Sequence, residues 1–159
     1  MNSDFWKNKK ILLTGHTGFK GSWLSIWLKK LGVELIGFSK DIPTKPSIFE
    51  LAKVSEGMTS IIGDINDFSL IQKVIEKNKP EIVIHMAAQS LVRRSYENPI
   101  ETFATNVMGT ANLLQSINAT RNTKVVINVT SDKCYENSGA ETIFSEDSPM
   151  GGYDPYSSS

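Results

Sequence analysis

Short apolar runs alternate along the chain with segments in which apolar residues recur at helical spacing. The runs are nearly continuous, as in strands that are buried on both faces of a parallel sheet. They span residues 10–14, 33–38, 60–63, 81–87 and 124–130. Because parallel strands need crossover connections, this alternation predicts a doubly wound α/β fold, in which helices cover both faces of a parallel sheet.

Three helices are expected between these strands. Helical spacing marks residues 21–31 and 67–77. A third, longer helix begins at Asn98, an N-cap residue that is followed by Pro99, which suits a first helical turn. We expect the apolar residues of this helix, which recur at helical spacing, to face the core. They are Ile100, Phe103, Val107, Ala111 and Leu114.

Composition and charge narrow the functional classes. The 159 residues carry 17 basic and 17 acidic side chains, and this zero net charge argues against a surface built to bind nucleic acid or membranes. The single cysteine, Cys134, excludes an internal disulfide framework, and His16 and His85 are too few to complete a metal site. No secretory segment and no run of about 18 apolar residues is present, so we expect one cytoplasmic domain without a metal.

The turn after the first expected strand contains three glycines at the spacing G-x-x-G-x-x-G. A helix follows directly, and its N-terminus offers unpaired N–H groups and the positive end of the helix dipole. Glycines let a pyrophosphate approach the backbone without a Cβ clash. The turn is therefore predicted to bind a dinucleotide. Its expected contact residues are Gly15, Thr17, Gly18, Phe19, Lys20 and Gly21.

This glycine spacing resembles the extended short-chain dehydrogenase/reductase family, whose members have a Rossmann-type fold. Residues 85–89 resemble the family's H-x-A-A segment, Asp64-Ile65 resembles its aspartate-hydrophobic pair around the adenine, and Asn106 matches its helix asparagine. A strand-end turn and a helix face are the structural alternatives for these segments. The resemblance implies further cofactor contacts at Asp64, Ile65, Ala87, Ala88, Gln89, Asn106 and Thr130.

The choice between NAD and NADP depends on the end of the second expected strand. Family members that prefer NAD often carry an acidic residue there, which holds the ribose hydroxyls. This chain has Ser39 and Lys40 before Asp41, and a serine beside a lysine favours a 2′-phosphate, so the residues alone lean slightly toward NADP. The resemblance implies NAD.

Residues that resemble the family's catalytic groups follow the fifth expected strand. In the family, the hydroxyl residue after this strand and a later tyrosine hydrogen-bond the substrate oxygen, and the tyrosine moves its proton. Ser131 and Tyr156 match these two groups. Within the family, segments 85–96, 130–135 and 150–156 resemble the CDP-glucose 4,6-dehydratases. Those enzymes oxidise the sugar at C4 with NAD, eliminate water across C5 and C6, and return the hydride to C6.

The resemblance also implies roles for Asp132 and Lys133. Sugar-nucleotide dehydratases commonly carry an Asp-Glu pair here, with one residue as acid for the C6 hydroxyl and the other as base for C5. Asp132 can be the acid, whereas Lys133 departs from the pair and can act as a base only when neutral. The Asp-Lys pair is itself part of the likeness to the CDP-glucose enzymes. Ser90 and Arg94 are the expected substrate contacts, and a solvated surface position is the alternative for Arg94.

The lysine of the family's Tyr-x-x-x-Lys motif would fall one residue beyond Ser159. We therefore expect residues 1–159 to be the truncated NAD(P)-binding Rossmann domain of a longer enzyme, inactive without a C-terminal nucleotide-sugar region. The family dimerises through the long helix and the helix that begins at Tyr156, so a homodimer or higher oligomer is implied. Synthesis of bacterial surface polysaccharide is the implied pathway. The alternatives are a sugar-nucleotide epimerase and a stand-alone dinucleotide-binding module.

Overall fold

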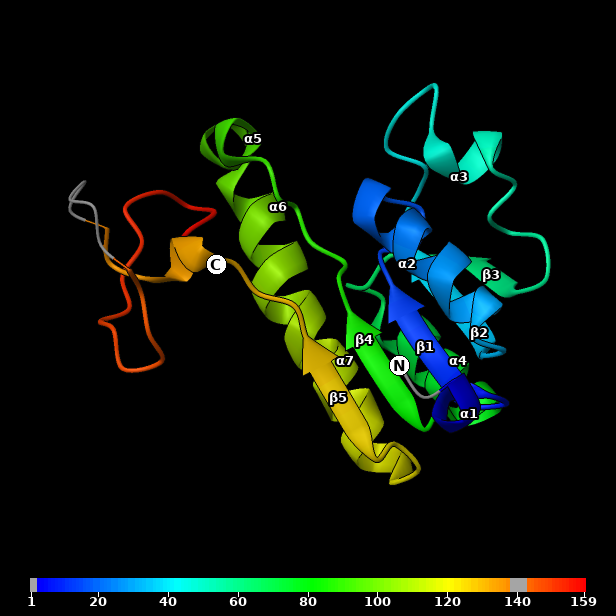
Figure 1. Cartoon of the computed structure of the whole chain (residues 1–159). Coiled ribbons are helices and arrows are strands. Elements are labelled where there is room, and N and C mark those ends of the chain that lie inside the picture. The colour runs from blue at the N-terminus through cyan, green and yellow to red at the C-terminus, as the bar shows by residue number, and fades with distance from the viewer. Residues whose placement is uncertain (1–2, 138–142) are drawn as a thin grey trace.

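The computed structural model describes residues 3–137 and 143–159. Its strands form a five-stranded sheet in the order β3-β2-β1-β4-β5, and all four pairings are parallel (Figure 1). The strands are β1 (Lys10–Thr14), β2 (Glu34–Ser39), β3 (Thr59–Ile62), β4 (Ile82–His85) and β5 (Val125–Asn128). The five strands predicted from the apolar runs are confirmed, with bounds that differ by a few residues at most.

Apart from α1, which precedes β1, the helices lie in the crossover connections between strands. They are α1 (Ser3–Trp6), α2 (Phe19–Lys30), α3 (Ile48–Leu51), α4 (Phe68–Asn78), α5 (Val92–Glu97), α6 (Pro99–Phe103) and α7 (Gly109–Thr120). A π-helical turn, η1 (Ala104–Met108), joins α6 to α7, and a 3₁₀ turn, η2 (Asp132–Cys134), follows β5. Within the described residues, no helix is both long and apolar enough to cross a membrane.

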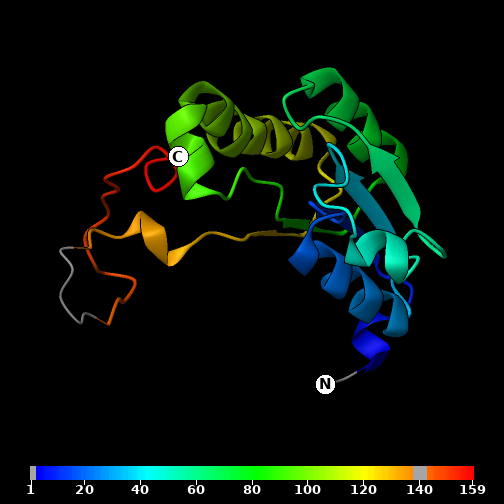
Figure 2. The ribbon, with the colours of Figure 1, turned by 90° about the horizontal axis from the view of Figure 1, so that it is seen from above.

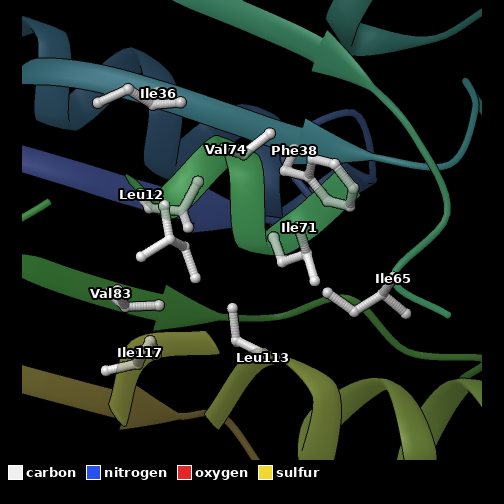
Figure 3. Packing of buried hydrophobic residues seen from close by; sticks show 10 residues of the cluster. Leu12, Ile36, Phe38, Ile65, Ile71, Val74, Val83, Leu113 and Ile117 are labelled. Carbon is white, nitrogen blue, oxygen red and sulfur yellow. The ribbon is translucent and has the colours of Figure 1, made fainter. Parts of the chain in front are cut away.

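The sheet separates two hydrophobic cores. Helix α2 covers one face, and α4 and α7 cover the other (Figure 2). Since strand side chains alternate between faces, Leu12 packs with Ile71 of α4 and Leu113 of α7 (Figure 3), while Leu13 packs with Leu28 of α2. Each fully buried aliphatic side chain contributes about 1.5–3 kcal/mol, so both layers stabilise the sheet. The predicted doubly wound fold is confirmed.

The predicted inward face of the long helix is wrong. Its apolar stripe faces outward, and Ile100 is 84% exposed. The buried side instead contains Thr102, Gly109 and Leu113. A Cβ on Gly109 would lie 2.5 Å from the Cγ2 atom of Ile65, so the helix passes too close to Ile65 for a larger residue there. The buried side thus combines Thr102 and Gly109 with Leu113, and the apolar stripe is left at the surface.

Strand β5 forms one edge of the sheet and pairs only with β4 among the described strands. Its residues are all exposed, including Val125, Val126 and Ile127. The chain after β5 extends away from the sheet and lies beside α6 (Figures 1 and 2). The carboxyl end of β5 therefore carries the predicted catalytic residues to the side of the long helix rather than over the sheet.

Candidate functional site

The carboxyl ends of all five parallel strands meet at one edge of the sheet, where ligands bind in open α/β folds. Four turns gather along this edge, after β1, β2, β3 and β4, and the start of the segment after β5 joins them (Figure 1). All the residues predicted for cofactor, substrate and catalysis lie in these segments or in the long helix beside them. The edge is therefore the candidate site.

The glycine turn after β1 has the shape of an anion cradle. Gly15 has a φ of 77°, and a Cβ there would lie 2.7 Å from the carbonyl oxygen of Met86. A Cβ on Gly21 would lie 2.0 Å from the carbonyl oxygen of Gly15. Gly18 is the N-cap of α2 and offers no capping side chain, which leaves the helix N-terminus to an anionic ligand. This turn fits the pyrophosphate of a dinucleotide.

A buried histidine, which the sequence analysis did not assign to the site, holds this turn against β2 and β3. His16 Nδ1 lies 2.9 Å from Ser39 Oγ, and its Nε2 lies 2.7 Å from Ser60 Oγ. The backbone N–H of Thr17 also donates to Ser39 Oγ, and the Thr17 hydroxyl donates to the carbonyl oxygen of Asp41. Burial lowers the pKa of His16 from 6.5 to about 4, so the ring is neutral near pH 7. Ser39 and Thr17 are thus occupied by protein partners.

Lys40, which follows β2, is also occupied. Its Nζ lies 3.2 Å from Asp64 Oδ2 and 3.7 Å from Glu101 Oε1. The hydrogen bond and the charge of Asp64 raise the pKa of Lys40 against a weaker opposing effect of burial. Arg94 forms a two-pronged pair with Glu101, with nitrogen–oxygen distances of 2.9–3.2 Å. Ser39 and Lys40 therefore do not form the open phosphate site that the sequence suggested.

Asp64 is fixed by its own turn as well as by Lys40. Burial would raise the pKa of Asp64, but the hydrogen bonds from Asn66 and Lys40 and the charge of Lys40 outweigh it, so its pKa is lowered. The neighbouring Ile65 is 4% exposed and packs in the core, and its carbonyl oxygen accepts from Asn112. Any contact of Ile65 with a ligand would therefore come from its backbone.

A second buried histidine connects β1, β4 and the long helix. The Thr14 hydroxyl oxygen accepts from the N–H groups of Met86 and Ala87, and lies 2.6 Å from His85 Nδ1. Because that oxygen already accepts twice, its proton is donated to Nδ1, which leaves the ring proton on Nε2 to reach Thr110 Oγ1 at 3.0 Å. Burial lowers the pKa of His85 to about 4. His85 is thus a neutral, structural residue that joins β1, β4 and the long helix at this edge.

The π-helical turn brings Asn106 to the loop after β4. Its Oδ1 accepts from the N–H of Gln89 at 2.8 Å, and its Nδ2 donates to the carbonyl oxygen of Gln89 at 3.1 Å and to Ser159 Oγ at 2.8 Å. The Gln89 side chain is bound to Leu91 and to Thr102. Asn106 thereby joins the loop after β4 to the segment of Tyr156, and Gln89 supports the loop instead of presenting its amide.

The predicted catalytic residues after β5 lie in and around η2. Ser131 Oγ caps this turn by accepting from the N–H of Lys133 at 3.2 Å, and it donates to Asp132 Oδ1 at 3.3 Å. Asp154 Oδ1 accepts from the N–H groups of Tyr156 and Ser157, each at 3.0 Å, and so holds the turn of the predicted catalytic tyrosine.

Asp154 is charged in this setting. Burial would raise the pKa of Asp154, but the hydrogen bonds from Ser157 and Tyr156 and the positive charge of Lys133 outweigh it and lower the pKa. A hollow of about 320 Å³ lies beside these groups. Its lining residues are Asp132, Lys133, Tyr135, Asn137, Gly151, Gly152, Tyr153 and Asp154. The structure thus brings Asp132 and Lys133 to one hollow, with Ser131 beside Asp132, whereas Tyr156 lies outside the lining, on the turn that Asp154 holds.

The remaining predicted residues lie along the same edge, mostly at the surface. Phe19, Lys20, Ala88, Ser90 and Thr130 are exposed there, and Ala87 is half-buried. No group of three or more His, Cys, Asp or Glu side chains suited to a metal ion occurs within residues 3–137 and 143–159.

Several sequence relatives are named as 4,6-dehydratases. CDP-glucose 4,6-dehydratase of Salmonella typhimurium is 54% identical over 159 residues, which are 100% of this chain and 44% of that protein. A probable dTDP-glucose 4,6-dehydratase of Sinorhizobium fredii is 32% identical over 161 residues, covering 94% of this chain and 45% of that protein. The chain therefore spans less than half the length of these relatives.

Solved structures share the fold. UDP-glucose 4-epimerase of Brucella ovis, in complex with NAD, superposes with a TM-score of 0.79 at 27% identity and covers 94% of this chain and 43% of its own. WbmG of Bordetella bronchiseptica, in complex with NAD and UDP, gives a TM-score of 0.81 at 25% identity and covers 95% of this chain and 46% of its own. The profile of the GDP-mannose 4,6 dehydratase family matches residues 12–159. With this match over nearly its whole length, the chain belongs to the GDP-mannose 4,6-dehydratase family.

Proposed function

We propose that this chain is the NAD-binding N-terminal part of a sugar-nucleotide 4,6-dehydratase that converts CDP-glucose to CDP-4-keto-6-deoxyglucose. Two observations carry the proposal: a glycine cradle at the carboxyl end of β1, and a hollow lined by Asp132 and Lys133 on the segment that follows β5. The identity of 54% with CDP-glucose 4,6-dehydratase of Salmonella typhimurium supports this substrate.

Gly15, Gly18 and Gly21 would hold the pyrophosphate of NAD at the N-terminus of α2. Bound NAD would supply the hydride acceptor and donor for the reaction. Two solved structures that contain NAD, at 27% and 25% identity, support this cofactor. The buried His16 and the turn after β2 would fix the position of the cradle, because His16 bonds Ser39 and Ser60 in two neighbouring strands.

Four side chains would act on the sugar. Ser131 and Tyr156 would hydrogen-bond its reacting hydroxyl, and Tyr156 would take up the hydroxyl proton. Asp132 would protonate the departing C6 hydroxyl, and Lys133 would remove the C5 proton. A lysine acts as a base only in its neutral form, so this role requires the substrate to cover the hollow and to exclude water from Lys133.

The outward apolar stripe of the long helix supports assembly. Ile100, Val107 and Met108 are 84%, 44% and 56% exposed, and an apolar helix face of this length is typical of a subunit interface. We infer that a second copy of the chain covers this stripe in a homodimer or higher oligomer. We further propose that the enzyme acts in the cytoplasm, in the synthesis of surface polysaccharide. Sedimentation velocity of Ile100→Glu against the unmodified protein tests the assembly, since a monomeric unmodified protein would contradict the inference.

The activity test uses the protein that contains this chain at the length of its relatives. Incubation with CDP-glucose and NAD should give the ultraviolet absorbance of a 4-keto-6-deoxy sugar, whereas UDP-glucose and dTDP-glucose should react far more slowly. Formation of an epimeric CDP-sugar without the keto product would identify an epimerase instead. No turnover with any sugar nucleotide, despite NAD binding, would point to a stand-alone binding module.

The role of Lys133 is tested by exchange of the C5 proton with solvent deuterium. Lys133→Ala should slow this exchange about 10²–10⁴-fold, the usual contribution of a general base. Lys53→Ala is the matched control, because Lys53 is an exposed lysine far along the chain that pairs only with Glu56 among the described ion pairs. An undiminished exchange rate in Lys133→Ala would remove Lys133 from the mechanism.

A further inference from the structure

Three separate segments of the candidate cofactor edge meet at Lys40. Lys40 follows β2, Asp64 follows β3, and Glu101 projects from α6. The Lys40 Nζ lies 3.2 Å from the Asp64 carboxylate and 3.7 Å from the Glu101 carboxylate. The side chains are 56%, 37% and 33% exposed, so the cluster lies at the surface where a ligand could reach it.

The charge of this cluster is unfavourable for a phosphate. Lys40 and Arg94 contribute two positive charges, and Asp64 and Glu101 contribute two negative charges. Asp41 adds a further negative charge that acts on Lys40 and helps to raise its pKa. The five side chains therefore sum to one net negative charge, beside the strand end that borders the ribose in dinucleotide-binding folds.

Glu101 has the geometry to maintain this balance. Arg94 holds it with three nitrogen–oxygen contacts of 2.9–3.2 Å, so its carboxylate is kept in one orientation toward Lys40. Glu101 thereby occupies both cations at once. The groups that could have bound a phosphate at the end of β2 are also engaged, because Ser39 Oγ accepts from Thr17 and contacts His16.

We propose that Glu101, a residue of the long helix, sets the preference for NAD over NADP by neutralising Lys40 and Arg94 at the ribose end of the cofactor site. The inference rests on the proposed function, since it presupposes that NAD binds this edge. NADP differs from NAD by a 2′-phosphate, which would meet net negative charge here and would find both cations already paired. Glu101 acts through Lys40 and needs no contact with NAD, so its removal should change the two affinities unequally.

Calorimetric titration of the chain with NAD and with NADP tests this. The unmodified chain should bind NAD at least about tenfold more tightly than NADP, and Glu101→Gln should improve NADP affinity about tenfold while changing NAD affinity less than about threefold, as expected from removal of one nearby charge. The NAD titration of the same variant also reports whether it is folded. Glu97→Gln is the matched control, because Glu97 is exposed at the end of α5 and forms no ion pair with the described residues. It should change neither affinity.

The double variant Lys40→Met/Glu101→Gln identifies the cation. It should lose most of the NADP affinity that Glu101→Gln gains, and retention of that gain would overturn the role of Lys40. Equal binding of NAD and NADP by the unmodified chain, or an unchanged NADP affinity in Glu101→Gln, would overturn the inference and leave the proposed function in place. Absence of NAD binding by the unmodified chain would instead overturn both.

Discussion

Mild acid should destabilise the chain through its two histidines. His16 and His85 are 0% and 3% exposed, and burial lowers the pKa of each from 6.5 to about 4. Both rings are neutral in the folded chain near pH 7, whereas both become protonated in the unfolded chain below its pKa. The unfolded state then binds more protons than the folded state. The contribution of the two neutral histidines to the free energy of unfolding is therefore present above about pH 6.5 and is lost progressively as the pH falls toward 4.

The size of the effect follows from these pKa values. A histidine whose pKa is 6.5 unfolded and about 4 folded loses about 2 kcal/mol of stability between about pH 7 and pH 5. The two together lose about 4 kcal/mol, a large part of the roughly 5–15 kcal/mol that stabilises a typical domain. Asp64 and Asp154 have lowered pKa values and act in the same direction, but from an ordinary value of 3.8 their effect falls at lower pH.

Urea unfolding followed by circular dichroism measures this dependence. Between about pH 6 and pH 5 the unfolding free energy should fall by about 2.5 kcal/mol, and by about half of that in either His16→Asn or His85→Asn. The comparison uses the change with pH, so a variant that is less stable at pH 7 remains informative. A dependence below about 0.5 kcal/mol in the unmodified chain, or one that neither variant reduces, would refute the burial argument.

Two further substitutions test the geometry of the site. Gly15→Ala should abolish NAD binding and lower the free energy of unfolding in urea by about 2–4 kcal/mol, because its Cβ would lie 2.7 Å from the Met86 carbonyl oxygen. Gly57 has a similar φ of 74°, but a Cβ there would meet no atom within 4 Å. Gly57→Ala should therefore lower the free energy of unfolding by only about 1–2 kcal/mol and leave NAD binding intact. Equal costs would contradict the close approach. Asn106→Ala should lower the free energy of unfolding by about 2–3 kcal/mol, because the backbone N–H and carbonyl groups of Gln89 lose their partner. An unchanged free energy of unfolding in urea would show that Asn106 does not hold this loop.

Local sequence was sufficient to predict the sheet and the glycine turn. The run of residues 10–14 has three consecutive apolar residues at its centre, as expected of a strand covered on both faces, and the glycines follow at once. The long helix shows where this reasoning stops. Its apolar stripe identified a helix correctly but gave the wrong face, since the buried side depends on the close approach of Gly109 to Ile65, far away in the sequence.

The site shows the same limit. Ser39 and Lys40 suggested a phosphate site when taken alone, but their partners His16 and Glu101 come from other turns and helices. No direct signal in the sequence pointed to His16 as a support of the cradle, because the hydrogen bonds of His16 depend on the pairing of β2 with β3. The available hint was a polar residue inside a glycine turn, with Ser39 at the end of β2 and Ser60 within β3.

Binding of NAD through the glycine turn after β1 is checked by calorimetric titration of the purified chain with NAD. We expect saturable binding at one site per chain, which Gly15→Ala removes and Gly57→Ala leaves unchanged. Absence of binding by a chain that unfolds cooperatively in urea, or binding that persists in Gly15→Ala, would contradict it.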